Sequence, residues 1–214
     1  GNPIPDPRRA GAATLVEFDG TRVLIDCGRG VVLRLAAAGV LPPMLDALFL
    51  THLHGDHLTD LNDVITTHWV MSPTPTTLPI FGPPRTREVV DATLAALAPD
   101  ISYRLAHHAD LTWEPMLEVT EITPGTTLPV GPASVRVAAT DHRPAEPTVA
   151  FRIDNDATSA VFGGDSVPCA GLDELCAGAG AYVQTVSLYR ATALSRVVVF
   201  ARSWETGGTH TVTL

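Results

Sequence analysis

The segment Thr51–His57, with the sequence Thr-His-Leu-His-Gly-Asp-His, constrains this chain more than any other feature. It follows the apolar run 47–50, which predicts a buried strand that ends in a loop of ligands. Imidazole and carboxylate groups are ligands that zinc, iron and manganese accept. A solvated polar loop is the alternative, but eight histidines in 214 residues would rarely place three within six positions. The segment therefore predicts two adjacent metal ions.

Two later segments supply further ligand side chains at the ends of predicted strands. Residues 135–140 alternate like a half-buried strand and lead to His142, while residues 158–162 run through Gly-Gly into Asp165. The carboxylate of Asp165 could bridge two cations. A turn-forming aspartate beside glycines is the alternative for Asp165, and the first motif favours the metal-binding interpretation.

In this order, the three motifs resemble those of the metallo-β-lactamase superfamily. Within it, the chain is most similar to the ribonuclease Z and arylsulfatase-like branch, because segments 5–11 and 24–30 resemble the opening hairpin of that branch. The resemblance covers about residues 3–186. It implies an α/β fold of the αββα sandwich type, in which two sheets pack face to face with helices outside each.

The resemblance also implies which residues hold the metals. His52, His54 and His142 would bind one ion, Asp56 and His57 would bind the second, and Asp165 would lie between them. The implied metal ligands are thus His52, His54, Asp56, His57, His142 and Asp165. Two zinc ions are the expected cofactors, with iron or manganese as alternatives.

The C-terminal region departs from the family pattern. The family normally adds a histidine after a last apolar strand, which here would be residues 196–200, and no histidine follows directly. His210, in a Gly/Thr-rich tail, is the remaining candidate, so the second metal site is expected to be the weaker one. The chain also begins where a first strand would be ending, so the sandwich is expected to be truncated at both ends.

The charge of the chain bears on its substrate. The chain contains 23 acidic residues and 14 arginines, no lysine, and a formal net charge of -9. An acidic chain repels polyanions at long range, and no long insertion resembles the arm with which the ribonuclease Z family grips tRNA. We therefore expect a small-molecule substrate, with nucleic acid an unlikely partner, and a homodimer is compatible with the sequence.

Length and composition fit a single domain over residues 1–214. A chain of this length can bury a substantial core, and no apolar stretch reaches the roughly 18 residues of a membrane span. Cys27, Cys169 and Cys176 are odd in number and lack ligand-like spacing, which favours reduced thiols. A cytoplasmic location is expected, with secretion left open because the N-terminus looks trimmed.

Hydrophobic periodicity predicts the secondary structure. Two halves each supply strands, and the ligands are expected along one edge of the sandwich, at strand ends. The predicted strands are 14–18, 21–26, 47–50, 78–81, 117–122, 134–140, 148–153, 158–162 and 181–186. The predicted helices are 30–38, 58–69, 86–97 and 171–177.

Other candidate residues are assigned a structural or surface role. His68, at the far end of a predicted helix, is interpreted as structural. His107 and His108 are adjacent and would point in different directions, so they are left as surface or interface residues. Arg143 follows His142 and could hold an anionic group of the substrate, although a simple surface arginine is slightly favoured.

These observations predict a metal-dependent hydrolase. Water held between two cations loses a proton near neutral pH and can attack a carbonyl, phosphoryl or sulfuryl centre. Asp56 would orient this water and accept its proton. The expected substrates are, in order, a carboxylic ester or lactone, a phosphodiester and an aryl sulfate. The competing hypothesis is a non-catalytic member of the fold that serves as a binding or scaffold protein.

Overall fold

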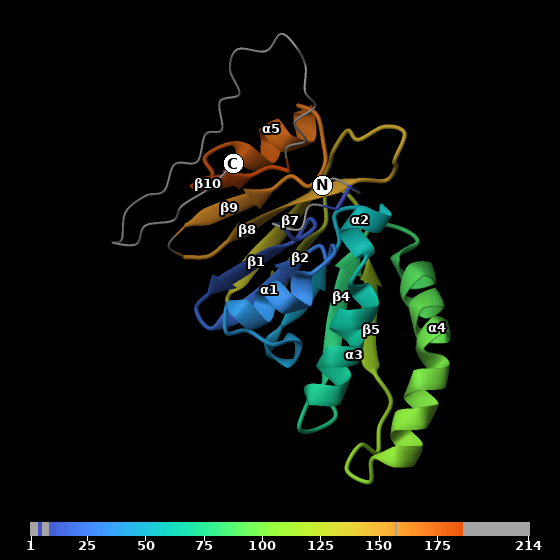
Figure 1. Ribbon diagram of the computed structural model, residues 1–214. Coiled ribbons are helices and arrows are strands. Elements are labelled where there is room, and N and C mark those ends of the chain that lie inside the picture. Colours follow the sequence, from blue (N-terminus) through green and yellow to red (C-terminus); the bar gives the residue numbers. More distant parts are fainter. Residues whose placement is uncertain (1–3, 6–8, 157, 186–214) are drawn as a thin grey trace.

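Two five-stranded sheets pack face to face in the computed structural model, which describes residues 4–5, 9–156 and 158–185 (Figure 1). The first sheet has the order β1-β2-β3-β4-β5, from β1 (Thr14–Phe18), β2 (Thr21–Ile25), β3 (Ala47–Phe49), β4 (Thr77–Gly82) and β5 (Met116–Glu121). The second has the order β10-β9-β8-β7-β6, from β6 (Thr127–Val130), β7 (Ala133–Ala139), β8 (Val149–Asp154), β9 (Ser159–Phe162) and β10 (Ala181–Val183).

Helices cover the outer face of each sheet, so the predicted α/β fold of the αββα type is confirmed (Figure 1). The helices are α1 (Val31–Ala37), α2 (Gly55–Leu58), α3 (Leu61–Met71), α4 (Thr86–His107) and α5 (Ala170–Cys176), with a 3-10 turn η1 (Pro42–Met44). Side chains of α1, α3 and α4 pack on the first sheet, and those of α5 pack on the second. Within the described residues, no helix is long and apolar enough to cross a membrane.

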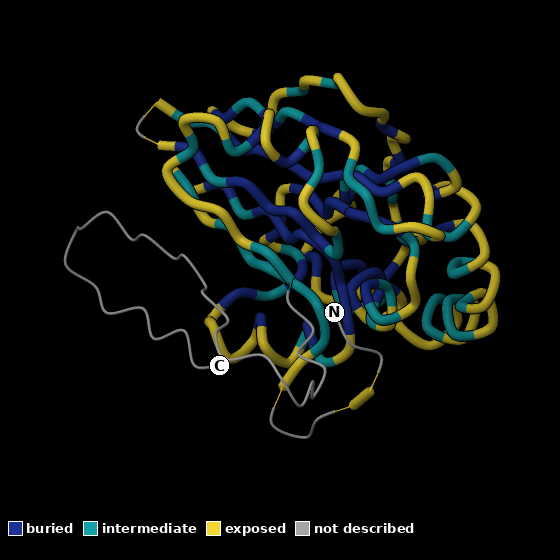
Figure 2. The backbone as a smooth tube through the Cα atoms, turned by 90° about the horizontal axis from the view of Figure 1, so that it is seen from above, coloured by how far each residue is buried: buried dark blue, intermediate teal, exposed yellow. Residues whose placement is uncertain are grey.

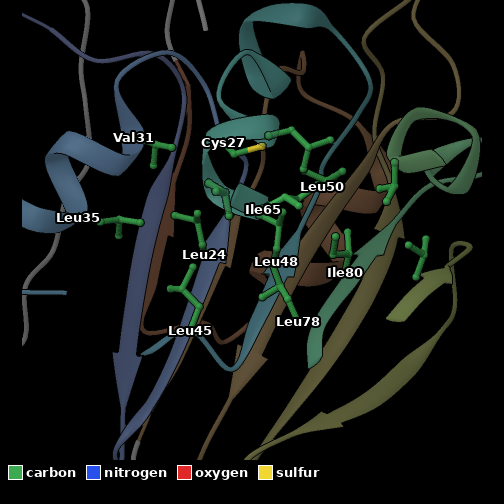
Figure 3. Packing of buried hydrophobic residues seen from close by; sticks show 14 of the residues in the cluster. Leu24, Cys27, Val31, Leu35, Leu45, Leu48, Leu50, Ile65, Leu78 and Ile80 are labelled. Atoms are coloured by element: carbon green, nitrogen blue, oxygen red, sulfur yellow. The ribbon is translucent and has the colours of Figure 1, made fainter. Parts of the chain in front are cut away.

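The period-2 alternation of the strands separates two apolar layers. Val23 and Ile25 of β2 point between the sheets, where they join a buried cluster with Phe151 of β8. Leu24 points to the other side and packs with Val31 of α1, as the close view of this cluster shows (Figure 3). Buried positions therefore run through the middle of the molecule and exposed ones lie at its periphery (Figure 2).

Strand direction brings the ligand-bearing segments to one edge. Strands β2, β3, β4 and β5 are mutually parallel, and β7 and β9 both run antiparallel to β8. The carboxyl ends of β2 and β3 are therefore neighbours, and those of β7 and β9, on either side of β8, lie at the same edge of their sheet. A hydrogen bond of 2.9 Å from the Val149 N–H to the Thr51 carbonyl oxygen joins the two sheets at this edge.

The elements differ from the sequence prediction at three places. The predicted helix 58–69 is divided into α2 and α3, and α2 includes the Gly-Asp-His end of the ligand motif. Helix α4 continues ten residues beyond 97, through Pro99, which lacks an N–H but does not end the helix. An ion pair of 2.7 Å between Arg104 and Asp100 supports this distal part. Strand β6 was not predicted.

Candidate metal centre

Three imidazoles meet at the end of strand β3. His52 and His54 lie in the loop between β3 and α2, and His142 lies after β7. His54 Nδ1 is 3.1 Å from His52 Nε2 and 3.2 Å from His142 Nε2. These nitrogens form a group whose candidate ligand atoms all lie within 4.8 Å of one another. The predicted convergence of the three histidines is therefore present.

The donors of this group fit a cation. Burial, with the imidazoles of His57 and His54 nearby, lowers the pKa of His52 to about 3, and burial also lowers the pKa of His142. A neutral imidazole ring, as these shifts favour for His52 and His142, can turn a nitrogen lone pair toward a shared cation. Ligands about 2.0–2.1 Å from a tetrahedral zinc ion lie about 3.3 Å apart, close to the nitrogen separations found here.

A second group consists of His52, His57 and Asp165. His57 is fully buried, and its Nε2 lies 3.4 Å from Asp165 Oδ1 without an aligned hydrogen bond to any described residue. Burial acts to lower the pKa of His57, but the Asp165 and Asp26 carboxylates outweigh it and raise the pKa to about 9. Burial acts to raise the pKa of Asp165, but His57 lowers it below its usual range. A metal cation could therefore replace the proton on His57 Nε2, beside the Asp165 carboxylate.

Asp26, which was not among the predicted site residues, holds the ligand loop in place through hydrogen bonds. It follows β2, is 4% exposed and adopts a left-handed φ of 60°. Its carboxylate accepts hydrogen bonds from the Thr51 N–H at 2.8 Å, the Thr51 hydroxyl at 2.9 Å and His57 Nδ1 at 2.7 Å. With Nδ1 donating to Asp26, His57 presents Nε2 to Asp165. The sequence signal was an apolar strand ending in aspartate beside the strand of the ligand motif.

The predicted ligands are not all brought together in the same way. The two groups contain His52, His54, His57, His142 and Asp165. Asp56 is half-buried in the first turn of α2 and belongs to neither group among the described residues. Its assignment as a ligand stays a prediction. His210 and the strand predicted at 196–200 lie outside the described residues.

The remaining candidates lie apart from these groups. His68 is 1% exposed on α3, and burial lowers its pKa, which agrees with a structural role. His107 ends α4 and His108 follows it, both exposed, and neither joins a described metal-binding group. Arg143 is exposed and makes an ion pair of 2.6 Å with Asp141, which favours the surface interpretation.

Comparison with known proteins agrees with this geometry. The family described as Beta-lactamase superfamily domain matches residues 21–201. Among curated relatives, the ribonuclease Z of Mycobacterium avium (strain 104) is 57% identical over 188 residues, which are 87% of this chain and 67% of the relative. The ribonuclease Z of Mycolicibacterium gilvum (strain PYR-GCK) is 54% identical, covering 87% and 66%. The chain thus spans about two thirds of the length of these relatives.

Solved structures share the fold. The short form of human tRNase Z has a TM-score of 0.66 at 22% identity, covering 85% of this chain and 73% of that protein. A metallo-beta-lactamase fold protein from Bacillus subtilis has a TM-score of 0.60 at 24% identity, covering 78% and 60%. At these identities, the likeness concerns the fold alone.

The expectation of a small-molecule substrate with nucleic acid as an unlikely partner is wrong. Relatives that are more than half identical over most of this chain are named ribonuclease Z. The physical error lies in the use of net charge, because charges in water are screened within about 8–10 Å and a distant acidic surface does not decide contacts at the site. The hydrolase prediction itself is supported by the same relatives. With its cluster of histidines and aspartate suited to a metal ion, the chain belongs to the beta-lactamase superfamily as one of its metallo-hydrolases.

Proposed function

We propose that this chain is a zinc-dependent nuclease that hydrolyses phosphodiester bonds in RNA. The observation that carries the proposal is its identity of 54–57% to enzymes named ribonuclease Z across about 87% of its length. The aligned family segment includes the whole ligand loop and both later ligand positions. Because the relatives are longer, the proposal concerns the site that this chain contains.

The residues that would hold the ions are those of the two groups. His52, His54 and His142 would hold one ion, and His57 and Asp165, which form a group with His52, would hold the second. When bound, such cations polarise a phosphoryl oxygen and make water more acidic. Asp26 would keep the tautomer and orientation of His57 fixed, as outer partners of ligating histidines commonly do.

The protein side chains would position the reaction and accept its proton. His54 is exposed while His52 and His57 are buried, so the centre opens to solvent on the His54 side. A phosphodiester entering there would meet the ligand loop first. Asp56, in the first turn of α2 directly after the loop and half-buried, would accept the proton of the attacking water.

A substrate panel tests this proposal. The zinc-loaded protein is incubated with a precursor tRNA, bis(p-nitrophenyl) phosphate, p-nitrophenyl butyrate and p-nitrophenyl sulfate. We expect cleavage of the RNA and turnover of the phosphodiester, both abolished by a chelator and restored by zinc. Turnover of the butyrate or sulfate ester with the RNA left intact would contradict the proposal.

A further inference from the structure

Three exposed arginines, Arg9, Arg29 and Arg34, have guanidinium groups that make no hydrogen bond or ion pair with another described residue. From their position, we infer that they form a phosphate-binding surface, the arginine surface, that holds the backbone of the RNA next to the site. This inference rests on the proposed function and extends it, because it assigns an RNA-binding surface to residues outside the ligand motifs.

The side chains of the other described arginines are already engaged. Each donates a hydrogen bond to a carboxylate or a backbone carbonyl, and the seven are Arg22, Arg85, Arg87, Arg104, Arg136, Arg143 and Arg152. The chain has 23 acidic residues and 14 arginines, yet none of the described carboxylates pairs with the guanidinium groups of these three arginines. Three such arginines on one surface therefore indicate a role outside internal pairing.

The three arginines share one surface because their segments are bonded together. The Gly11 N–H donates to the Arg29 carbonyl oxygen at 2.6 Å, which places the segment that carries Arg9 against the loop before α1. A side chain at Gly30 would meet Ala10 at 3.7 Å. Arg34, on α1, lines a cavity of about 130 Å³ together with Ala10 and Gly11.

The loop that carries Arg29 is also fixed to the ligand helix α2. The Cys27 N–H donates to the His57 carbonyl oxygen at 2.8 Å, and the Asp60 N–H donates to the Cys27 carbonyl oxygen at 2.9 Å. Gly28 packs so closely that an added Cβ would stand 2.4 Å from the Asp56 carbonyl oxygen. The arginine surface is thus joined to the metal centre through a short, hydrogen-bonded path.

The chemistry of this surface fits phosphate groups. A guanidinium binds phosphate through two parallel N–H···O bonds and cannot lose its charge at neutral pH. The Asp60 carboxylate, which lies against this loop, already accepts the Gly30 N–H at 2.7 Å. Because screening limits the repulsion from distant acidic residues, three contacting arginines can bind RNA despite the net charge of -9.

A triple variant, Arg9→Ala, Arg29→Ala and Arg34→Ala, tests this surface in the zinc-loaded chain. The matched control, Arg22→Ala, Arg104→Ala and Arg136→Ala, removes the same charge from arginines that are paired with carboxylates away from the ligand loop. Binding of a labelled precursor tRNA is measured between 50 and 200 mM salt, together with KM and kcat for its cleavage and turnover of bis(p-nitrophenyl) phosphate.

The salt slope is the slope of the logarithm of RNA affinity against the logarithm of salt concentration. We expect this slope to be shallower by about 2 to 3 in the test variant, since each phosphate contact contributes about 0.7–0.9. The ratio of RNA affinity at 50 mM salt to RNA affinity at 200 mM salt should be about 20- to 40-fold smaller in the test variant than in wild type. KM for RNA should rise, while kcat and turnover of the small phosphodiester stay near wild type. The control should keep the wild-type slope.

Equal RNA binding and salt slope in wild type and test variant would overturn the inference while leaving the nuclease proposal intact. An equal loss in the control would also overturn it, because net charge rather than the arginine surface would then be responsible. If the wild-type chain neither bound nor cleaved RNA, the proposed function and this inference would both fall. Melting curves of both triple variants exclude unfolding as the cause of any loss.

Discussion

His57 donates its Nδ1 hydrogen to the buried carboxylate of Asp26 across 2.7 Å. The same carboxylate also accepts the N–H and the hydroxyl of Thr51, the residue that opens the ligand loop. One aspartate at the end of β2 therefore fixes both ends of the loop that carries His52 and His54. The direction in which His57 presents Nε2 follows from this bond, because only one of its two ring nitrogens remains for a ligand role.

Asp26→Asn should weaken metal binding by about 10- to 100-fold, as loss of an outer partner of a ligating histidine typically does. The amide cannot accept all three hydrogen bonds, and its NH₂ group would oppose a donor. Metal affinity is measured by competition with a chelator of known affinity. The control is Asp46→Asn, which disturbs a single bond of 2.7 Å to the Arg22 N–H at the other end of β2. An affinity unchanged in Asp26→Asn would show that Asp26 does not orient His57.

Two zinc ions of unequal affinity should bind. The first has three imidazoles, whereas the second has His57 and Asp165 with His52 nearby and no further ligand among the described residues. A chelator should therefore remove the second ion first, and activity should fall with it. Asp165→Ala should retain about one equivalent. Metal content is followed by elemental analysis during stepwise chelation, and two ions lost together with equal affinity would contradict this prediction.

Metal binding at pH 7 should release about one proton. His57, with a pKa of about 9 in the metal-free protein, must lose its proton, whereas His52, with a pKa of about 3, is already neutral. Apparent affinity should therefore rise with pH up to about 9 and then level off. Calorimetry in buffers of different ionisation enthalpy counts the protons, and the absence of proton release would show that His57 is neutral or is not a ligand.

The same shift makes the stability of the metal-free protein depend on pH. Because the folded pKa of His57, about 9, lies above its unfolded value of about 6.5, this group contributes stability that is fully present below about pH 6.5. That contribution is lost as pH rises through about 9. Denaturant unfolding of the metal-free protein at pH 6.5 and pH 9.5 should show the loss, and His57→Gln should reduce the difference.

Asp56→Ala should lower turnover by about 100-fold or more, in the range of lost general-base assistance. The three imidazoles of the first site do not include Asp56, so the first zinc ion should remain bound. Turnover of precursor tRNA and metal content are measured on the same preparation. Loss of one zinc ion would instead identify Asp56 as a ligand, and unchanged turnover would remove it from the mechanism. Asp63→Ala, on α3, is the control.

The ligand edge of the fold could be predicted because it depends on local patterns. A continuous apolar run defines β3, apolar residues in a strand-like pattern define β7 and β9, and each strand is followed by a ligand-type side chain. Asp26 was missed because its role depends on which strands are neighbours. β2 is parallel to β3 and ends at the same edge, so its terminal aspartate lies below the ligand loop. Strand neighbours are a tertiary property that no single segment encodes.

The substrate class was predicted wrongly because the prediction relied on the net charge of the whole chain. Net charge adds distant carboxylates to arginines at the site, although water and salt separate their effects. Pairing decides which positive charges are available to a substrate. Arg143 is paired with Asp141, and Arg85 is paired with Glu88. The guanidinium group of Arg29 has no such partner among the described residues. Helix α4 illustrates a local limit, because it was predicted to end at residue 97 and instead continues through Pro99 to His107.

RNA cleavage by a ligand variant shows whether the histidine group supports a zinc-dependent nuclease. Precursor tRNA is incubated with zinc-loaded wild type and with His142→Ala, which removes one of the three converging imidazoles, and with His108→Ala as an exposed control. We expect zinc-dependent cleavage by wild type and by the control, and a loss of at least about 100-fold in His142→Ala. Cleavage that persisted in a folded His142→Ala protein, or RNA left intact by the zinc-loaded wild type, would contradict this expectation.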